Sequence, residues 1–356
     1  MELECKPDAE EAKERVDAWW RGEVLDRVPI KVVAPLMPPS HSESAPQDPM
    51  RWRTDPELVI PRLEAYVDAT FWGGEALPLV FPAAIGMVAI LAAYLGCPYR
   101  FLDTQTAWAE PIIDDWESAP ALEFNPDNKW WQTSAGLLKT AAERAPGRYY
   151  VGLPDLNGPG EILARLRSTE GLLFDLMDNP GPLRPALDKI NFAWFRYYEA
   201  CVGIIHQYVE GSIYWMGIWS LTPSIDLQCD FSCMISAEMF DELFLPPLRE
   251  QTAWVDRTVY HLDGPGAIRH LDSLLALPKL DGIQWVPGAG APPMREWVDL
   301  CRRILEAGKL LYIACAPDEV QFLLSHLPHE GLLLETHCQS REAAEELLKN
   351  VALWSG

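Results

Sequence analysis

Residues 256–269, DRTVYHLDGPGAIR, decide the fold. The β-branched and aromatic residues 258–260 favour a buried strand. The strand is followed by His261 and Asp263, whose i, i+2 spacing places both side chains on one face of an extended chain. A Gly-Pro-Gly turn and a helix from residue 268 come next, and this order is typical of active sites in α/β proteins. The alternative is a strand-end histidine followed by an aspartate that caps the next helix.

Seven further runs resemble strands, at residues 30–36, 76–81, 149–154, 212–219, 282–286, 309–314 and 332–336. Helical patterns separate most of them, beginning with an amphipathic helix at 9–21 and ending with one at 341–353. Eight strands alternating with helices predict a single (β/α)8 barrel domain over residues 1–356. We interpret residues 83–148, rich in Trp and Pro, as an insertion over the barrel mouth with helices at 83–95 and 128–144. A doubly wound sheet is the alternative, but no phosphate-binding glycine fingerprint follows the first strand.

Composition narrows the class of protein. The chain has 356 residues, of which 49% are hydrophobic and 23% charged, as in ordinary folded proteins. A net charge of −23 argues against nucleic acid, whose phosphates need basic partners. The longest apolar run, 83–95, is too short to span a membrane. Eight cysteines without a CxxC pair, and no visible export signal, predict reduced thiols in the cytoplasm.

Several segments resemble those of the uroporphyrinogen decarboxylase superfamily, and in particular its corrinoid-linked methyltransferase branch. They are LDRVPI at 25–30, MISAEMFDELFLPPLRE at 234–250, a strand ending in His-x-x, and a last strand with a terminal cysteine. The resemblance implies a (β/α)8 barrel. The decarboxylases hold substrate carboxylates with an Arg-Gln-x-Gly-Arg segment after the first strand. Residues 32–41, VVAPLMPPSH, contain no arginine, so the resemblance favours the methyltransferases.

A zinc site is implied by the same resemblance. The methyltransferases hold zinc with a His-x-Cys and a later Cys, and the matching residues here are His261, Asp263 and Cys338. A carboxylate in place of a thiolate leaves a more Lewis-acidic ion, better suited to an oxygen ligand than to activating a thiol. The family's methylation of a thiol, demethylation of an oxygen- or nitrogen-bound methyl, and delivery to a folate-type acceptor therefore stay equally open, and the resemblance implies a corrinoid carried on a partner protein.

Other polar and aromatic residues are predicted to lie at the same end of the strands. The predicted catalytic residues are Asp230, Asp226 and Arg269, the first two in the loop after the fourth strand. The predicted substrate-binding residues are Asp155, Asn157, Trp215, Trp219 and Trp285. Each has a structural alternative: a turn for the Asp and Asn residues, a surface ion pair for Arg269, and the core for the tryptophans. A tryptophan cluster would suit a flat aromatic or quaternary-ammonium ligand.

The preferred function is a metal-dependent methyltransferase that acts with a corrinoid protein on a small methylated substrate or methyl acceptor. A second copy of the chain, in a homodimer, is the other expected protein partner. The alternative is a metal-free, decarboxylase-like lyase acting on a small carboxylated substrate. A glycosidase-like hydrolase is disfavoured because the seventh strand has no carboxylate before Asp318. Near Cys338, Glu335 is expected to form a salt bridge, and His337 to point away from Glu335.

Overall fold

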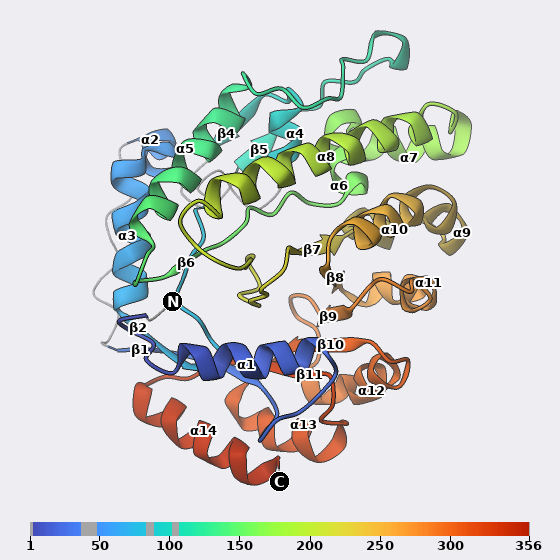
Figure 1. Cartoon of the computed structure of the whole chain (residues 1–356). Helices are drawn as coiled ribbons and strands as arrows, with labels where there is room; N and C mark the ends of the chain where they lie inside the picture. Colours follow the sequence, from blue (N-terminus) through green and yellow to red (C-terminus); the bar gives the residue numbers. More distant parts are fainter. Residues whose placement is uncertain (1–2, 37–47, 83–88, 102–106, 356) are drawn as a thin grey trace.

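Six parallel strands and one antiparallel edge strand form the central sheet of this computed structural model, which describes residues 3–36, 48–82, 89–101 and 107–355. The strand order is β2-β1-β11-β10-β9-β8-β7. Their bounds are β1 (Ile30–Pro35), β2 (Thr70–Gly74), β7 (Ser224–Gln228), β8 (Arg257–Asp263), β9 (Gly282–Val286), β10 (Leu310–Ala314) and β11 (Leu332–His337). Figure 1 shows the C-terminal helices outside these strands. The predicted α/β class with a parallel sheet is confirmed.

Two further parallel strands, β3 (Leu79–Val80) and β6 (Tyr150–Val151), pair with each other, and a single bridge joins Leu153 to Tyr214. A third sheet, the antiparallel pair β4 (Tyr99–Phe101) and β5 (Ala107–Ala109), lies in the predicted insertion. Among the described residues, no ladder connects β3 to β1 or β6 to β7. Closure into a barrel therefore stays a prediction.

Helices follow most strands. They are α1 (Ala9–Trp20), α2 (Pro49–Thr54), α3 (Pro56–Asp68), α4 (Ile90–Tyr94), α5 (Lys129–Arg144), α6 (Pro159–Arg167), α7 (Thr169–Asp178), α8 (Leu183–Ile205), α9 (Ala237–Met239), α10 (Leu245–Trp254), α11 (Leu271–Leu275), α12 (Val298–Glu306), α13 (Val320–His326) and α14 (Arg341–Trp354). The expected helices at 9–21, 128–144 and 341–353 are confirmed. Of the expected helix at 83–95, α4 forms the described part, and residues 83–88 lie outside the description. The insertion's position over the mouth stays a prediction.

Helix α1 lies across the amino-terminal ends of the strands, opposite their polar ends. The indole N–H of Trp19 donates to the carbonyl of Gly331, directly before β11, at 2.8 Å. The indole N–H of Trp20 donates to the Trp219 carbonyl at 2.9 Å. Both indoles are buried, so each N–H needs a partner. Functional groups are therefore expected at the other, carboxyl ends of the strands.

The predicted fourth strand at 212–219 is wrong. Ser212 and Ser220 exchange two backbone hydrogen bonds, at 2.7 and 2.8 Å, and Gly217 turns the chain with a φ of 65°. The segment thus folds back on itself, and the strand is β7, twelve residues after Ser212. Asp226 consequently lies within a strand, not in the loop after it.

The short strand β2 was also missed. Helix α3 ends at Asp68, and the chain returns as an antiparallel strand beside β1. No described helix combines the length and apolar character needed to cross a membrane.

Candidate active site

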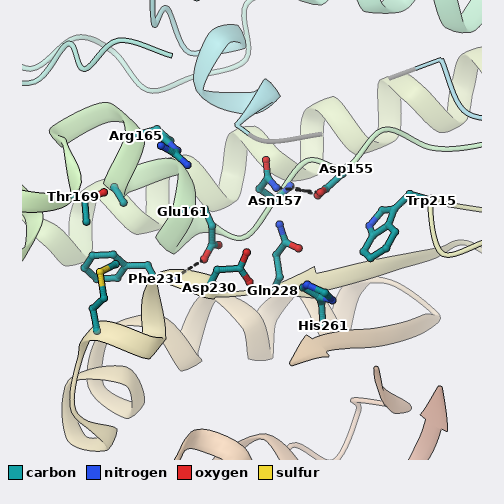
Figure 2. Close-up of a pocket in the computed structure, with 12 residues that line it drawn as sticks. Asp155, Asn157, Glu161, Arg165, Thr169, Trp215, Gln228, Asp230, Phe231 and His261 are labelled. Atoms are coloured by element: carbon teal, nitrogen blue, oxygen red, sulfur yellow. Dashed lines mark hydrogen bonds between the residues drawn. The ribbon is translucent and has the colours of Figure 1, made fainter. Parts of the chain in front are cut away.

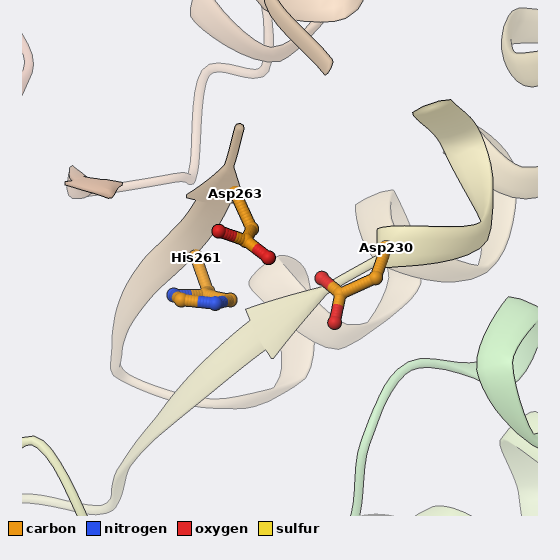
Figure 3. A group of neighbouring side chains, drawn as sticks. All are labelled: Asp230, His261 and Asp263. Carbon is orange, nitrogen blue, oxygen red and sulfur yellow. The ribbon is translucent and has the colours of Figure 1, made fainter. Parts of the chain in front are cut away.

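One imidazole and two carboxylates converge where β7 and β8 end. Ligand atoms of Asp230, His261 and Asp263 all lie within 4.8 Å of one another, and Figure 3 shows the three side chains facing a common point. The pleat of β8 places His261 and Asp263 on one face, as their spacing predicts. Asp230 enters from the neighbouring strand, two residues after Gln228, which is the register partner of His261.

The three side chains fit a divalent cation. Zinc accepts histidine nitrogen and carboxylate oxygen at about 2.0–2.2 Å, so two ligands of one ion lie at most about 4.4 Å apart. The ligand atoms of the three side chains, within 4.8 Å of one another, therefore lie near this limit. A set of one nitrogen and two oxygens suits zinc and harder cations better than ions that prefer sulfur.

Two neighbours hold the His261 ring. Its Nδ1 lies 2.6 Å from the Gln284 Oε1, across the β8–β9 register. Because an amide oxygen can only accept, His261 donates its Nδ1–H there, and Nε2 keeps its lone pair for a cation. The Trp215 ring packs edge-on at 5.5 Å and 81°. The imidazole is thus fixed in both tautomer and orientation.

A cavity of about 380 Å³ opens beside this group, and we call it the acidic pocket. Figure 2 shows Glu161 beside Asp230, and Asp155 on the side of the cavity opposite His261. The lining residues are Asp155, Asn157, Glu161, Ala164, Arg165, Thr169, Trp215, Gln228, Asp230, Phe231, Met234 and His261. Asp226 and Gln228, two residues apart on β7, lie on the same face of the strand. The charge of Asp226 raises the pKa of Asp155, and His261 in turn lowers the pKa of Asp226.

The loop between β6 and α6 supplies one wall. Asn157 adopts a φ of 58°, a left-handed conformation that Asn tolerates. Its backbone and side-chain N–H groups donate to Asp155, at 2.8 and 3.1 Å. Gly158 lets the loop approach β7, since a Cβ there would lie 1.8 Å from the Gln228 carbonyl oxygen. This close approach brings Glu161, in the first turn of α6, next to Asp230.

The carboxyls of the acidic pocket are hard to ionise together. Burial, with Asp226 nearby, raises the pKa of Asp155 well above its usual range. Burial and the charge of Asp230 raise the pKa of Glu161 to about 8. Burial raises the pKa of Asp226 to about 6, although the Trp215 indole N–H and His261 oppose the rise. The pocket therefore favours protons or other cations.

A second cavity, of about 470 Å³, shares Trp215 with the acidic pocket. Three of its lining side chains, Lys31, Tyr312 and Glu335, form a group that we call the Lys31 cluster. The Lys31 ammonium donates to Glu335, to the Met216 carbonyl, and to the Tyr312 hydroxyl at 3.2 Å. Tyr312 donates to Glu335. Although burial opposes it, Lys31 lowers the pKa of Glu335 far below the usual range. The expected salt bridge of Glu335 is confirmed.

His337 was expected to point away from Glu335, and this is wrong. Its Nε2 lies 3.3 Å from the Glu335 Oε1, because residues two apart on a strand share a face. The hydrogen bond to Glu335 raises the pKa of His337.

The structure does not bring Cys338 into the group of metal-ligating side chains. Cys338 is buried beyond the end of β11, where its backbone N–H donates to the Val33 carbonyl at 2.8 Å. Burial raises the pKa of its thiol. Asp230, predicted as a catalytic acid, takes the third place in the group.

Three other predicted residues lie outside both cavities. Arg269 is exposed, and its guanidinium donates to the backbone carbonyls of Gly266 and Ile235, at 3.0 and 3.4 Å. Trp285 is fully buried against Trp297, with ring centroids 5.0 Å apart. Trp219 is buried, with the Lys13 ammonium 5.0 Å from its ring centroid. Of the three predicted tryptophans, Trp215 lines the acidic pocket.

Sequence reasoning missed Glu161, Gln228, Gln284, Lys31 and Tyr312. Lys31 had a visible signal, since a lysine inside the apolar strand IKVVAP predicts a buried partner. Gln284 had a similar signal in GIQWV. Glu161 had none, because a glutamate in the first turn of a helix is ordinary.

The chain shares its fold with a methyltransferase. The solved structure of a methyltransferase from Methanosarcina mazei superposes with a TM-score of 0.62, over 97% of this chain and 99% of that one. The two sequences are 15% identical, so the likeness concerns the fold alone. No protein-family model matches the chain, and no curated protein matches it in sequence.

Proposed function

We propose that the chain is a zinc-dependent methyltransferase that acts with a corrinoid protein on a small methylated substrate or methyl acceptor. The group of Asp230, His261 and Asp263 at the carboxyl ends of two adjacent parallel strands carries the proposal. Active sites of α/β folds lie at this edge. The fold shared with a methyltransferase supports the reaction type, and the segments that resemble the corrinoid-linked branch support the partner.

The residues of this site would have two roles, binding the cation and orienting the His261 ring. Asp230, His261 and Asp263 would hold the cation, which, when bound, supplies Lewis acidity at the atom that carries or receives the methyl group. Gln284 would keep Nε2 of His261 available, and Trp215 would restrict the ring. Two carboxylates and no thiolate favour an oxygen or nitrogen atom over sulfur as the substrate atom.

The charge of the pocket disfavours the alternative lyase. A metal-free decarboxylase must attract a carboxylate, yet Arg165 is the one Lys or Arg among the lining residues of the acidic pocket. Asp155, Glu161 and Asp230 line the same cavity and offer such a substrate no positive charge.

The test uses methylcobalamin as a free corrinoid donor. Protein stripped of metal by a chelator is compared with the same protein given one equivalent of zinc, against a panel of amine, phenol and thiol acceptors. We expect zinc-dependent loss of the methylcobalamin spectrum, reduced at least about 100-fold in His261→Ala. His326→Ala, at an exposed position on α13, is the matched control. Equal rates with and without zinc, or no transfer to any acceptor, would contradict the proposal.

A further inference from the structure

One of the three metal-ligating side chains is less firmly held by the sheet than the other two. His261 and Asp263 lie in β8, which is hydrogen-bonded to β7 on one side and to β9 on the other. Asp230 is exposed and begins the short 3-10 turn Asp230–Met234, which we call the Asp230 turn. A side chain on a turn is placed less precisely than one on a strand. Contacts that fix the Asp230 turn should therefore matter for the metal site.

A second turn, Pro265–His270, follows β8 and packs against the Asp230 turn. The two turns approach closely at Gly266, where a Cβ would lie 3.1 Å from the Cβ of Cys233. The segment after the strand that carries His261 and Asp263 thus lies directly against the segment that carries Asp230.

His270 joins the two turns by a hydrogen bond. Its side chain is 1% exposed, and its Nε2 lies 2.8 Å from the Ser232 carbonyl oxygen, within the Asp230 turn. Burial lowers the pKa of His270, so the ring is neutral at pH 7. Because a carbonyl oxygen only accepts, the one N–H of the neutral ring is on Nε2 and is donated to Ser232.

Packing alone does not explain a histidine at this position. The His270 ring packs on Phe240, with centroids 4.5 Å apart, and its Nδ1 is buried without a hydrogen-bond partner among the described residues. An unpaired buried acceptor is costly, so a phenylalanine would fill the same space at lower cost. What phenylalanine could not supply is the N–H to Ser232.

We propose that His270 is a positioning residue that holds the Asp230 turn, and with it the Asp230 carboxylate, in place for the cation. The inference rests on the metal group of the proposed function and extends it to a residue that does not contact the cation. Glu161 holds the same turn from α6, since its Oε1 accepts from the Phe231 N–H at 3.0 Å. Loss of such an outer hydrogen bond typically weakens metal binding about 10- to 100-fold.

The test compares His270→Phe, which keeps a ring against Phe240 but has no N–H, with His270→Gln, whose amide N–H replaces the one on Nε2. Zinc affinity of the full-length protein is measured by competition with a chromophoric chelator. We expect His270→Phe to bind zinc at least about tenfold more weakly than the wild type, and His270→Gln to bind within about threefold of it. Urea denaturation of metal-free protein should give the opposite order, with a lower midpoint for His270→Gln, which loses the ring packing. A merely structural histidine would make zinc affinity follow stability.

Hydrogen exchange of metal-free protein gives a readout that needs no zinc. The Ile235 N–H donates to the same Ser232 carbonyl at 3.2 Å. Exchange over residues 230–235 should be at least about fivefold faster in His270→Phe than in the wild type or His270→Gln.

His329→Phe is the matched control, since His329 donates a ring N–H to the Leu324 carbonyl at 2.9 Å, before the amino end of β11. It should change neither zinc affinity nor exchange over residues 230–235. Unchanged zinc affinity or unchanged exchange in His270→Phe, or an equal loss of affinity in His270→Gln, would overturn the inference. With zinc-dependent methyl transfer intact, any of these results leaves the proposed function standing. Wild-type protein that binds no zinc would overturn both.

Discussion

Two groups of buried charge lie on either side of Trp215, and they differ in how their charges are compensated. In the Lys31 cluster, the ammonium has three acceptors, and both oxygens of Glu335 accept hydrogen bonds. In the acidic pocket, burial raises the pKa values of Asp155, Glu161 and Asp226, and one buried oxygen of Glu161 has no donor. A satisfied group is explained by the fold itself, whereas an unsatisfied one needs a ligand. We therefore assign a structural role to the Lys31 cluster and a binding role to the acidic pocket.

The largest effect is expected from breaking the Lys31 cluster. Lys31→Met leaves Glu335 buried without its cationic partner and should lower the free energy of unfolding by about 3–5 kcal/mol. Urea denaturation at pH 7 measures it. Lys139→Met, at an exposed position on α5, is the control. A loss below about 1 kcal/mol would show that the cluster is not a structural ion pair.

The acidic pocket should behave in the opposite way. Glu161→Gln should raise the free energy of unfolding of metal-free protein at pH 8 by about 1–3 kcal/mol, with little effect at pH 4.5. The pKa of Glu161 is raised from 4.5 to about 8. The native state therefore binds more protons than the unfolded state in this window, and wild-type stability falls as pH rises through it. Urea denaturation at several pH values tests this, and parallel curves for the two proteins would contradict it.

Loss of the Gln284 hydrogen bond should weaken the metal site without unfolding the protein. Gln284→Leu frees the His261 ring, so zinc affinity should fall about tenfold, or ~1.4 kcal/mol. Competition with a chromophoric chelator measures the affinity. Gln207→Leu, exposed beyond the end of α8, is the control. Unchanged affinity would mean that Trp215 alone orients the imidazole.

The smallest effect is expected at Arg269. Its contacts are to backbone carbonyls at the surface, so Arg269→Ala should change zinc-dependent methyl transfer less than about threefold. A loss of 100-fold in the methylcobalamin assay would restore the catalytic role that the sequence predicted.

The sequence predicted elements with a strong periodic pattern. Strand β8, with His261 and Asp263 on one face, follows from its alternation and the glycine turn, and β9 matches its expected bounds. The fourth strand was misplaced because the run 212–219 is as apolar as a strand, and only the tertiary hydrogen bonds between Ser212 and Ser220 reveal a loop. The pairing of Glu161 with Asp230 depends on how closely a loop approaches β7, which no local pattern encodes.

The identity of the third metal ligand is the point on which sequence and structure differ most. The resemblance implies Cys338, whereas the geometry brings Asp230 to His261 and Asp263. Elemental analysis of Asp230→Ala and Cys338→Ala, purified beside the wild type and dialysed against the same zinc buffer, decides between them. The account predicts about one zinc per chain in the wild type and in Cys338→Ala, and less than about a tenth of that in Asp230→Ala. Full zinc in Asp230→Ala, with loss in Cys338→Ala, would contradict it.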